Sequence, residues 1–222
     1  MKLLLSLPLS DTAQKYYGST APTYNKVGDA GIDLPFIGDV KPYDAEVTET
    51  IGVISFETVF AMYDNVYPAI FDTFNTVLKQ SDIVDILTHF LTRKDRVFCE
   101  LTPSHFDIRP RSSIGKSPFR LANCVGTIDK TYRGIEIFFD EEGEYIISAK
   151  EDALGCYLDY HPQLGKPRAD KHVIYAGDRL LQVVSPNLDD ILWVRLDFTE
   201  ANCLFWSEVI GNKNRGGFGS TN

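Results

Sequence analysis

The segment RPRSSIGK, residues 109–116, places an arginine and two serines side by side at Arg111, Ser112 and Ser113. An arginine presents a planar set of donors that matches the oxygens of a phosphate group. Serine hydroxyls and the free backbone N–H groups of a glycine-containing turn add donors at shorter range. The segment therefore indicates a site for a phosphorylated small molecule. For Ser113 and Lys116 a plain solvated turn is the alternative interpretation.

The last residues of the chain, RGGFGSTN (215–222), combine an aromatic ring and a cation with small residues. Such a composition favours neither a helix nor a durable strand. A glycine-rich terminus is often disordered, so Arg215 and Phe218 on this tail are weak support for a site when they are taken alone.

Five short stretches that carry chemistry follow one another along the chain. They are DAGIDL (29–34), RPRSSIGK (109–116), NCVGTIDKTYRG (123–134), AGDRLLQVV (176–184) and KNRGGFGST (213–221). Together and in this order they resemble the trimeric dUTPase family, the dUTP nucleotidohydrolases. The resemblance covers roughly residues 1–50, 97–140 and 173–222, and it leaves out the segment 54–94.

The resemblance implies a mainly β fold, a dUTPase-like β-barrel or jelly-roll-type β-clip in a homotrimer, with residues 1–222 as one domain. It implies hydrolysis of dUTP to dUMP and pyrophosphate, which keeps uracil out of DNA and supplies dUMP. Water attacks the α-phosphorus, so positioning and charge neutralisation do most of the work. Mg²⁺ is the implied cofactor. Because it bridges triphosphate oxygens and keeps several waters, no metal-binding residue is predicted.

By the same resemblance, Asp129 is the general base or water-positioning group in a β-hairpin formed by the third stretch. Uracil would lie against the hairpin backbone near Asn123, Gly126 and Ile128, where cytosine would leave polar groups unpaired. Tyr132 would pack beneath the deoxyribose and exclude a 2′-hydroxyl. The alternative is an ordinary turn aspartate and a core tyrosine.

The resemblance places Arg111 and Ser112 on the phosphate chain, with Ser113 in support. Gln182 would contact the phosphates or the attacking water, and Asp33 would lie near the catalytic centre. A purely structural aspartate is the alternative for Asp33. We expect Asp178 and Arg179 to be structural and to link subunits.

Residues 212–222 would form a flexible arm that closes over an active site elsewhere in the trimer. In that position Phe218 stacks on uracil, and the arm excludes bulk water. The residues expected on the terminal phosphates are Gly219, Ser220 and Thr221.

The cation of this arm departs from the family pattern, which has an arginine five residues before the phenylalanine. Lys213 stands there, and the nearest arginine is Arg215. A lysine lacks the bidentate fork of an arginine, so either residue is a candidate for the γ-phosphate.

Two other functions remain open. A dCTP deaminase-like or bifunctional enzyme of the same fold would need a glutamate on the strand after the third stretch, and Glu136 lies one position away from the useful place. A regulatory role would use the segment 54–94 to bind a protein partner, although packing of its aromatic rings against the core is the simpler explanation.

The elements that position these residues are predicted as follows. Residues 1–50 are expected to be strand and turn, with a first strand in KLLLSLP. Helical spacing of apolar residues predicts a helical insertion over 54–94, with Ser81 as an N-cap. Strand character returns after Arg96, with a hairpin turn at 140–144.

The last third of the chain is predicted to contain a loop-rich excursion over 150–172. A strand is expected at 193–198 and a short helix within 199–210.

Composition limits the alternatives. The chain has 222 residues and a formal net charge of −9, so broad binding to a nucleic-acid backbone is disfavoured. Four cysteines lack metal-ligand spacing, which favours reduced thiols in a cytoplasmic or nuclear compartment. No segment approaches a membrane span of about 20 apolar residues.

Overall fold

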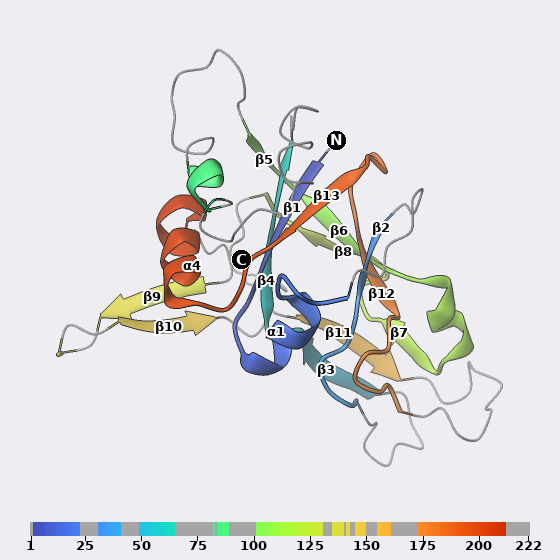
Figure 1. Ribbon diagram of the computed structural model, residues 1–222. Coiled ribbons are helices and arrows are strands. Elements are labelled where there is room, and N and C mark those ends of the chain that lie inside the picture. Colours follow the sequence, from blue (N-terminus) through green and yellow to red (C-terminus); the bar gives the residue numbers. More distant parts are fainter. Residues whose placement is uncertain are drawn as a thin grey trace, which may run out of the picture.

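The protein is mainly β with few helices, as the computed structural model in Figure 1 shows. Within the described residues the strands form four sheets and none closes into a barrel. The described residues are 2–22, 31–40, 49–64, 82, 84–88, 101–130, 135–139, 141–142, 145–149, 155–160 and 173–211.

One four-stranded sheet, with the order β13-β1-β4-β5, runs through the middle of the molecule (Figure 1). Its strands are β13 (Ile191–Arg195), β1 (Lys2–Pro8), β4 (Thr58–Asp64) and β5 (Thr102–Ser104). Strand β1 is parallel to β13 and antiparallel to β4. The prediction of a first strand in KLLLSLP is confirmed, and every residue of β1 is buried.

This central sheet separates two hydrophobic cores. Side chains alternate across a strand, so Leu4 of β1 belongs to the first core while Leu3 and Leu5 belong to the second. The side chains of strand β4 alternate between the cores in the same way, with Met62 in the first core and Ala61 in the second. The sheet is therefore buried on both faces.

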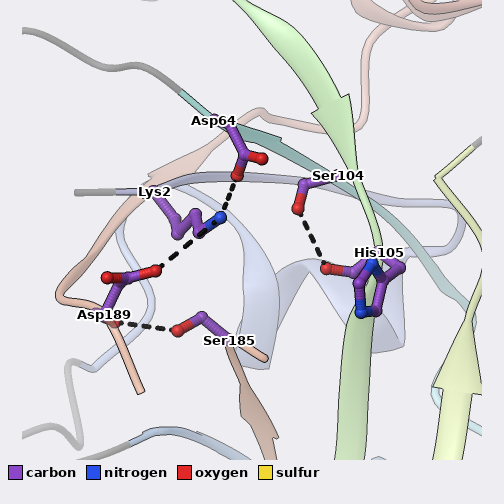
Figure 2. Close-up of polar contacts among 6 residues, drawn as sticks. All are labelled: Lys2, Asp64, Ser104, His105, Ser185 and Asp189. Carbon is purple, nitrogen blue, oxygen red and sulfur yellow. Dashed lines mark hydrogen bonds and ion pairs between the residues drawn. The ribbon is translucent and has the colours of Figure 1, made fainter. Parts of the chain in front are cut away.

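An ion pair ties the start of β1 to its neighbours. Figure 2 shows the Lys2 ammonium group between two carboxylates. It donates a hydrogen bond to Asp64 at the end of β4, and it lies 3.7 Å from Asp189 Oδ2 in the turn before β13. Lys2 is 8% exposed, so this pairing compensates a charge that would be costly to bury alone.

The second four-stranded sheet has the order β2-β12-β6-β8. Its strands are β2 (Gly31–Leu34), β12 (Leu181–Val184), β6 (Phe106–Pro110) and β8 (Gly126–Ile128). One face carries apolar side chains that enter the first core, among them Ile32, Val183 and Ile108. The opposite face carries polar side chains and is called the polar face below.

Two smaller sheets complete the strand arrangement. Strands β3 (Glu49–Ser55), β11 (Gly155–Tyr160) and β7 (Phe119–Leu121) form one of them, in the order β3-β11-β7. Strands β9 (Ile135–Phe139) and β10 (Tyr145–Ala149) pair as an antiparallel hairpin. Its turn lies at 141–142, which confirms the predicted hairpin turn.

The predicted loop over 150–172 is wrong for part of its length, because β11 lies inside it and pairs with both β3 and β7. The residues at 161–172 lie outside the described residues.

The predicted helical insertion over 54–94 is wrong at its start. Strand β3 ends at Ser55, and strand β4 begins at Thr58. The uninterrupted apolar run from Val59 to Tyr63 fits a strand buried on both faces as well as a helix, and pairing with β1 decides for the strand. A helix does follow Ser81, at 82 and 84–88; the remaining residues up to 94 lie outside the described part.

Helices flank the central sheet. Helix α1 (Asp11–Tyr17) was not predicted, and it interrupts the expected strand-and-turn region. Helix α4 (Glu200–Phe205) and the π-helical turn η3 (Trp206–Ile210) confirm the helix expected within 199–210, and their buried apolar side chains belong to the second core. None of the helices in the described ranges is both long and apolar enough to cross a membrane.

Candidate functional site

The sheet β2-β12-β6-β8 collects four of the five chemistry-bearing stretches. Strand β2 belongs to the first stretch, β8 to the third and β12 to the fourth. The second stretch begins in β6 and continues into a 3₁₀ helix, η1 (Ser112–Lys116). Segments that lie far apart in the sequence therefore share one sheet.

A polar row crosses this sheet. Gln182 of β12 is the register partner of Asp33 on β2 and of Arg109 on β6. Because side chains directly opposite one another share a face, all three lie on the polar face. The predicted residues Asp33 and Gln182 are therefore neighbours in the structure.

Gly31 allows the strands to approach closely at this row. A Cβ atom on Gly31 would lie 2.7 Å from the Val183 carbonyl oxygen and 2.9 Å from Val184 Cγ2. It would also lie 3.1 Å from Gln182 Oε1. A larger residue would displace the backbone of β12. The close packing of β2 against β12 therefore requires a glycine at this position of the first stretch.

Asp33 orients two arginines. Arg111 Nε lies 2.8 Å from Asp33 Oδ1, and Arg179 Nη1 lies 3.4 Å from Asp33 Oδ2. The Asp33 side chain is only 7% exposed, whereas both arginines are about a third exposed. A buried carboxylate needs such partners, and the pairing holds the Arg111 guanidinium in one orientation. Arg179, which we expected to link subunits, makes this contact within its own chain.

The backbone of Arg179 fixes the phosphate-binding candidates from the other side. Its carbonyl oxygen accepts hydrogen bonds from Arg111 Nη1 at 2.9 Å and from Ser113 Oγ at 3.1 Å. The Arg111 N–H donates to the Leu180 carbonyl at 2.8 Å. Ser113 is therefore held in a supporting position, while Ser112 beside it is exposed. The Nη2 end of Arg111 takes part in neither contact.

The third stretch occupies the edge of the same sheet. Gly126 and Ile128 are half-buried in β8, Asn123 is exposed in the preceding turn, and Asp129 is exposed directly after the strand. The second half of the expected β-hairpin, residues 131–134, lies outside the described residues. Strand β8 pairs with β6, and β9 pairs with β10.

Sequence reasoning missed one cluster on the polar face. Asp107 Oδ2 accepts from Arg109 Nη2 at 2.7 Å and from Arg109 Nε at 3.2 Å. Asp107 Oδ1 accepts from Thr127 Oγ1 at 2.8 Å. The alternation of polar and apolar residues in FDIRP was the available signal, because it places Asp107 and Arg109 on one face. We call these three residues the Asp107 cluster.

The remaining predicted residues lie outside the described residues. They are Tyr132, Lys213, Arg215, Phe218, Gly219, Ser220 and Thr221, together with the arm 212–222.

The described residues of this region hold no preformed cage for a divalent cation. Within the described ranges, no group of three or more His, Cys, Asp or Glu side chains is placed to hold a metal ion. Both carboxylate oxygens of Asp33 face guanidinium groups, which compete with a metal for the same lone pairs.

Comparison with models of known protein families gives no match, and a search of curated proteins also gives none.

Proposed function

We propose that this chain is a dUTP nucleotidohydrolase that releases dUMP and pyrophosphate. The main support is the sheet β2-β12-β6-β8, which brings Asp33, Gln182 and Arg111 together from three separate stretches. These stretches also carry the resemblance to the trimeric dUTPase family. The homotrimer, the β-clip fold and the closing arm are part of the same proposal.

In this proposal Arg111 binds the phosphate chain. Its Nε and Nη1 atoms are held by Asp33 and by the Arg179 carbonyl, so the guanidinium is preorganised before a ligand arrives. Preorganised donors stabilise the charge that develops in a transition state without reorganising. Ser112 adds a hydroxyl beside it, and Ser113 keeps the turn in place.

Gln182 and Asp129 handle the attacking water. Gln182 lies half-exposed on the polar face, in register with Asp33, where its amide can orient a water or a phosphate oxygen. Asp129 accepts the proton of the water as general base. Mg²⁺, when bound with the triphosphate, offsets its negative charge.

Product analysis tests the proposed activity. Purified protein is incubated with Mg²⁺ and dUTP, and in parallel with dCTP. We expect dUMP and pyrophosphate in equal amounts from dUTP and little product from dCTP. Deamination of dCTP would instead favour the deaminase alternative, and no reaction with dUTP would refute the proposal.

Substitution of the proposed general base, Asp129, provides the matched variant. Asp129→Asn keeps the size of the side chain but removes its basicity, so turnover should be abolished. Near-full turnover would show that Asp129 does not have the assigned role.

Deletion of residues 213–222 tests the arm. We expect a folded protein that has lost most of its activity, because bulk water is no longer excluded. Unchanged kinetics would remove the arm from the proposal.

A further inference from the structure

Among the described strands, β8 pairs with β6 alone. It is three residues long and lies at the edge of its sheet. Its register with β6 consists of Phe106↔Ile128, Asp107↔Thr127 and Ile108↔Gly126. Short edge strands with one partner are weakly specified in register unless side chains fix them. Asp129 follows this strand immediately, so any slip of β8 moves the proposed base.

The Asp107 cluster adds a side-chain hydrogen bond to β8, beside the packing of Ile128 against the first core. The Thr127 hydroxyl donates to Asp107 Oδ1 at 2.8 Å, directly across the register pair. Asp107 is 8% exposed, and Arg109 holds its other oxygen through two donors, at 2.7 and 3.2 Å. The carboxylate is therefore fixed on one side by Arg109 and bonded to β8 on the other.

The same cluster reaches the polar row. Arg109 is the register partner of Gln182, which is in turn the register partner of Asp33. Asp33 is ion-paired with Arg111. A continuous set of neighbouring polar side chains thus runs across one sheet face, from β8, the strand just before Asp129, to Arg111, the arginine assigned to phosphate.

We propose that Asp107, through Thr127, is a positioning residue that holds β8 and the following Asp129 in place relative to Gln182 and Arg111. This inference rests on the proposed function. Asp107 touches no substrate in this account and acts on the geometry of the base alone. Loss of the contact should therefore lower kcat for dUTP and leave KM nearly unchanged.

The test uses Thr127→Val as the main variant, because valine keeps the shape and the strand preference of threonine and removes only the hydroxyl. We expect kcat to fall about tenfold, as a small misplacement of a reacting group costs one to two orders of magnitude, with KM within about a factor of two. Thr127→Ser restores the hydroxyl and should recover most of kcat. Asp107→Ala should lower kcat at least as much as Thr127→Val.

Asp64→Asn is the control for Asp107→Ala, since it also weakens a carboxylate–cation pair, but with Lys2 on the central sheet. Its kcat should equal that of the wild type. An unchanged kcat in Thr127→Val, a raised KM alone, or an equal loss in Asp64→Asn would overturn the inference.

A structural readout separates this inference from the proposed activity. Hydrogen exchange of a peptide that covers 123–130 should rise in Thr127→Val and in Asp107→Ala, with peptides from β1 and β4 unchanged. Unchanged exchange in 123–130 overturns the role of Asp107 even if the enzyme hydrolyses dUTP. A wild-type protein that does not hydrolyse dUTP, but whose variants show faster exchange, overturns the proposed function and with it the catalytic part of the inference.

Discussion

The two four-stranded sheets differ in what covers their faces. The sheet β13-β1-β4-β5 lies between two hydrophobic cores, and its strand β1 is buried at every residue. The sheet β2-β12-β6-β8 covers the first core with one face only, and its polar face carries Asp33, Gln182 and Arg109. Figure 1 shows the first sheet in the middle of the molecule and β12 to one side of it.

This difference assigns stability to the central sheet and the proposed chemistry to the sheet β2-β12-β6-β8. A sheet buried on both faces contributes apolar area and offers no side chains to a ligand. A sheet with one free face can hold polar groups in register while its other face anchors them. The proposed site uses the second arrangement, so substitutions in the two sheets should have different consequences.

The largest expected effect is on stability, in the central sheet. Leu5 of β1 is 0% exposed in the second core, so Leu5→Ala should lower the free energy of unfolding by about 3 kcal/mol or more. Urea denaturation measures this loss. Turnover of dUTP per folded molecule should stay unchanged, and Leu188→Ala, at a residue 57% exposed, should alter neither quantity. A loss of kcat in fully folded Leu5→Ala protein would contradict the different roles assigned to the two sheets.

The next effect is on activity, in the second sheet. Arg111→Lys keeps the charge but loses the Nε contact with Asp33, so kcat/KM for dUTP should fall about 100-fold, as for other preorganised donors. The thermal midpoint should change little. Arg120→Lys is the control, because Arg120 also bonds to the η1 turn, through the Ile114 and Ser117 carbonyls, without forming part of the polar row. An equal loss there would assign the effect to disorder of the turn.

A smaller effect is expected at Gly31, where β2 and β12 approach closely beside the polar row. Gly31→Ala brings a methyl group within 2.7 Å of the Val183 carbonyl oxygen, and overpacking of this kind costs about 1–3 kcal/mol. Because the added carbon also meets Gln182 Oε1, kcat should fall together with stability. Gly38→Ala, where a Cβ meets nothing within 4 Å, should have no effect. A neutral Gly31→Ala would contradict the close approach of β2 and β12.

The smallest effect concerns thiol reactivity. Burial, with a further contribution from Glu200, raises the pKa of the Cys203 thiol from 9.0 to about 11. The neutral thiol is therefore favoured by folding, and this contribution to stability is present below pH 9 and is lost as the pH rises through 11. At pH 8, iodoacetamide followed by peptide mapping should modify exposed Cys124 quickly and buried Cys203 slowly. Equal rates would contradict the burial of the second core.

Parts of the fold follow from local patterns. The run KLLLSLP predicts β1, and the acidic segment between two β-forming runs predicts the β9–β10 turn. The run Val59–Tyr63 misleads because an unbroken apolar segment has no period, so a strand buried on both faces resembles a buried helix. Helix α1 was missed although Ser10 is its N-cap and Asp11 lies in its first turn.

Some residues of the candidate site can be named from the sequence, but their connections cannot. The chemistry of Arg111 and its serines is visible in the sequence. The ion pair between Asp33 and Arg111 joins residues from separate strands, and no local pattern states that pairing. The bond from Thr127 to Asp107 is similarly hidden, because it depends on the register of β6 with β8. The pairing of β8 with β6 also depends on tertiary contacts, because the two strands are separate in the sequence.

The most direct test of the central claim is a hydrogen-exchange footprint of a bound nucleotide. The protein is measured with and without Mg²⁺ and α,β-imido-dUTP, a substrate analogue that resists hydrolysis. We predict slower exchange in peptides that cover β2, residues 109–116 and β12, and no change in peptides from β1 and β4. Protection confined to the central sheet, or no protection at saturating nucleotide, would contradict the assignment of the polar face as the nucleotide site.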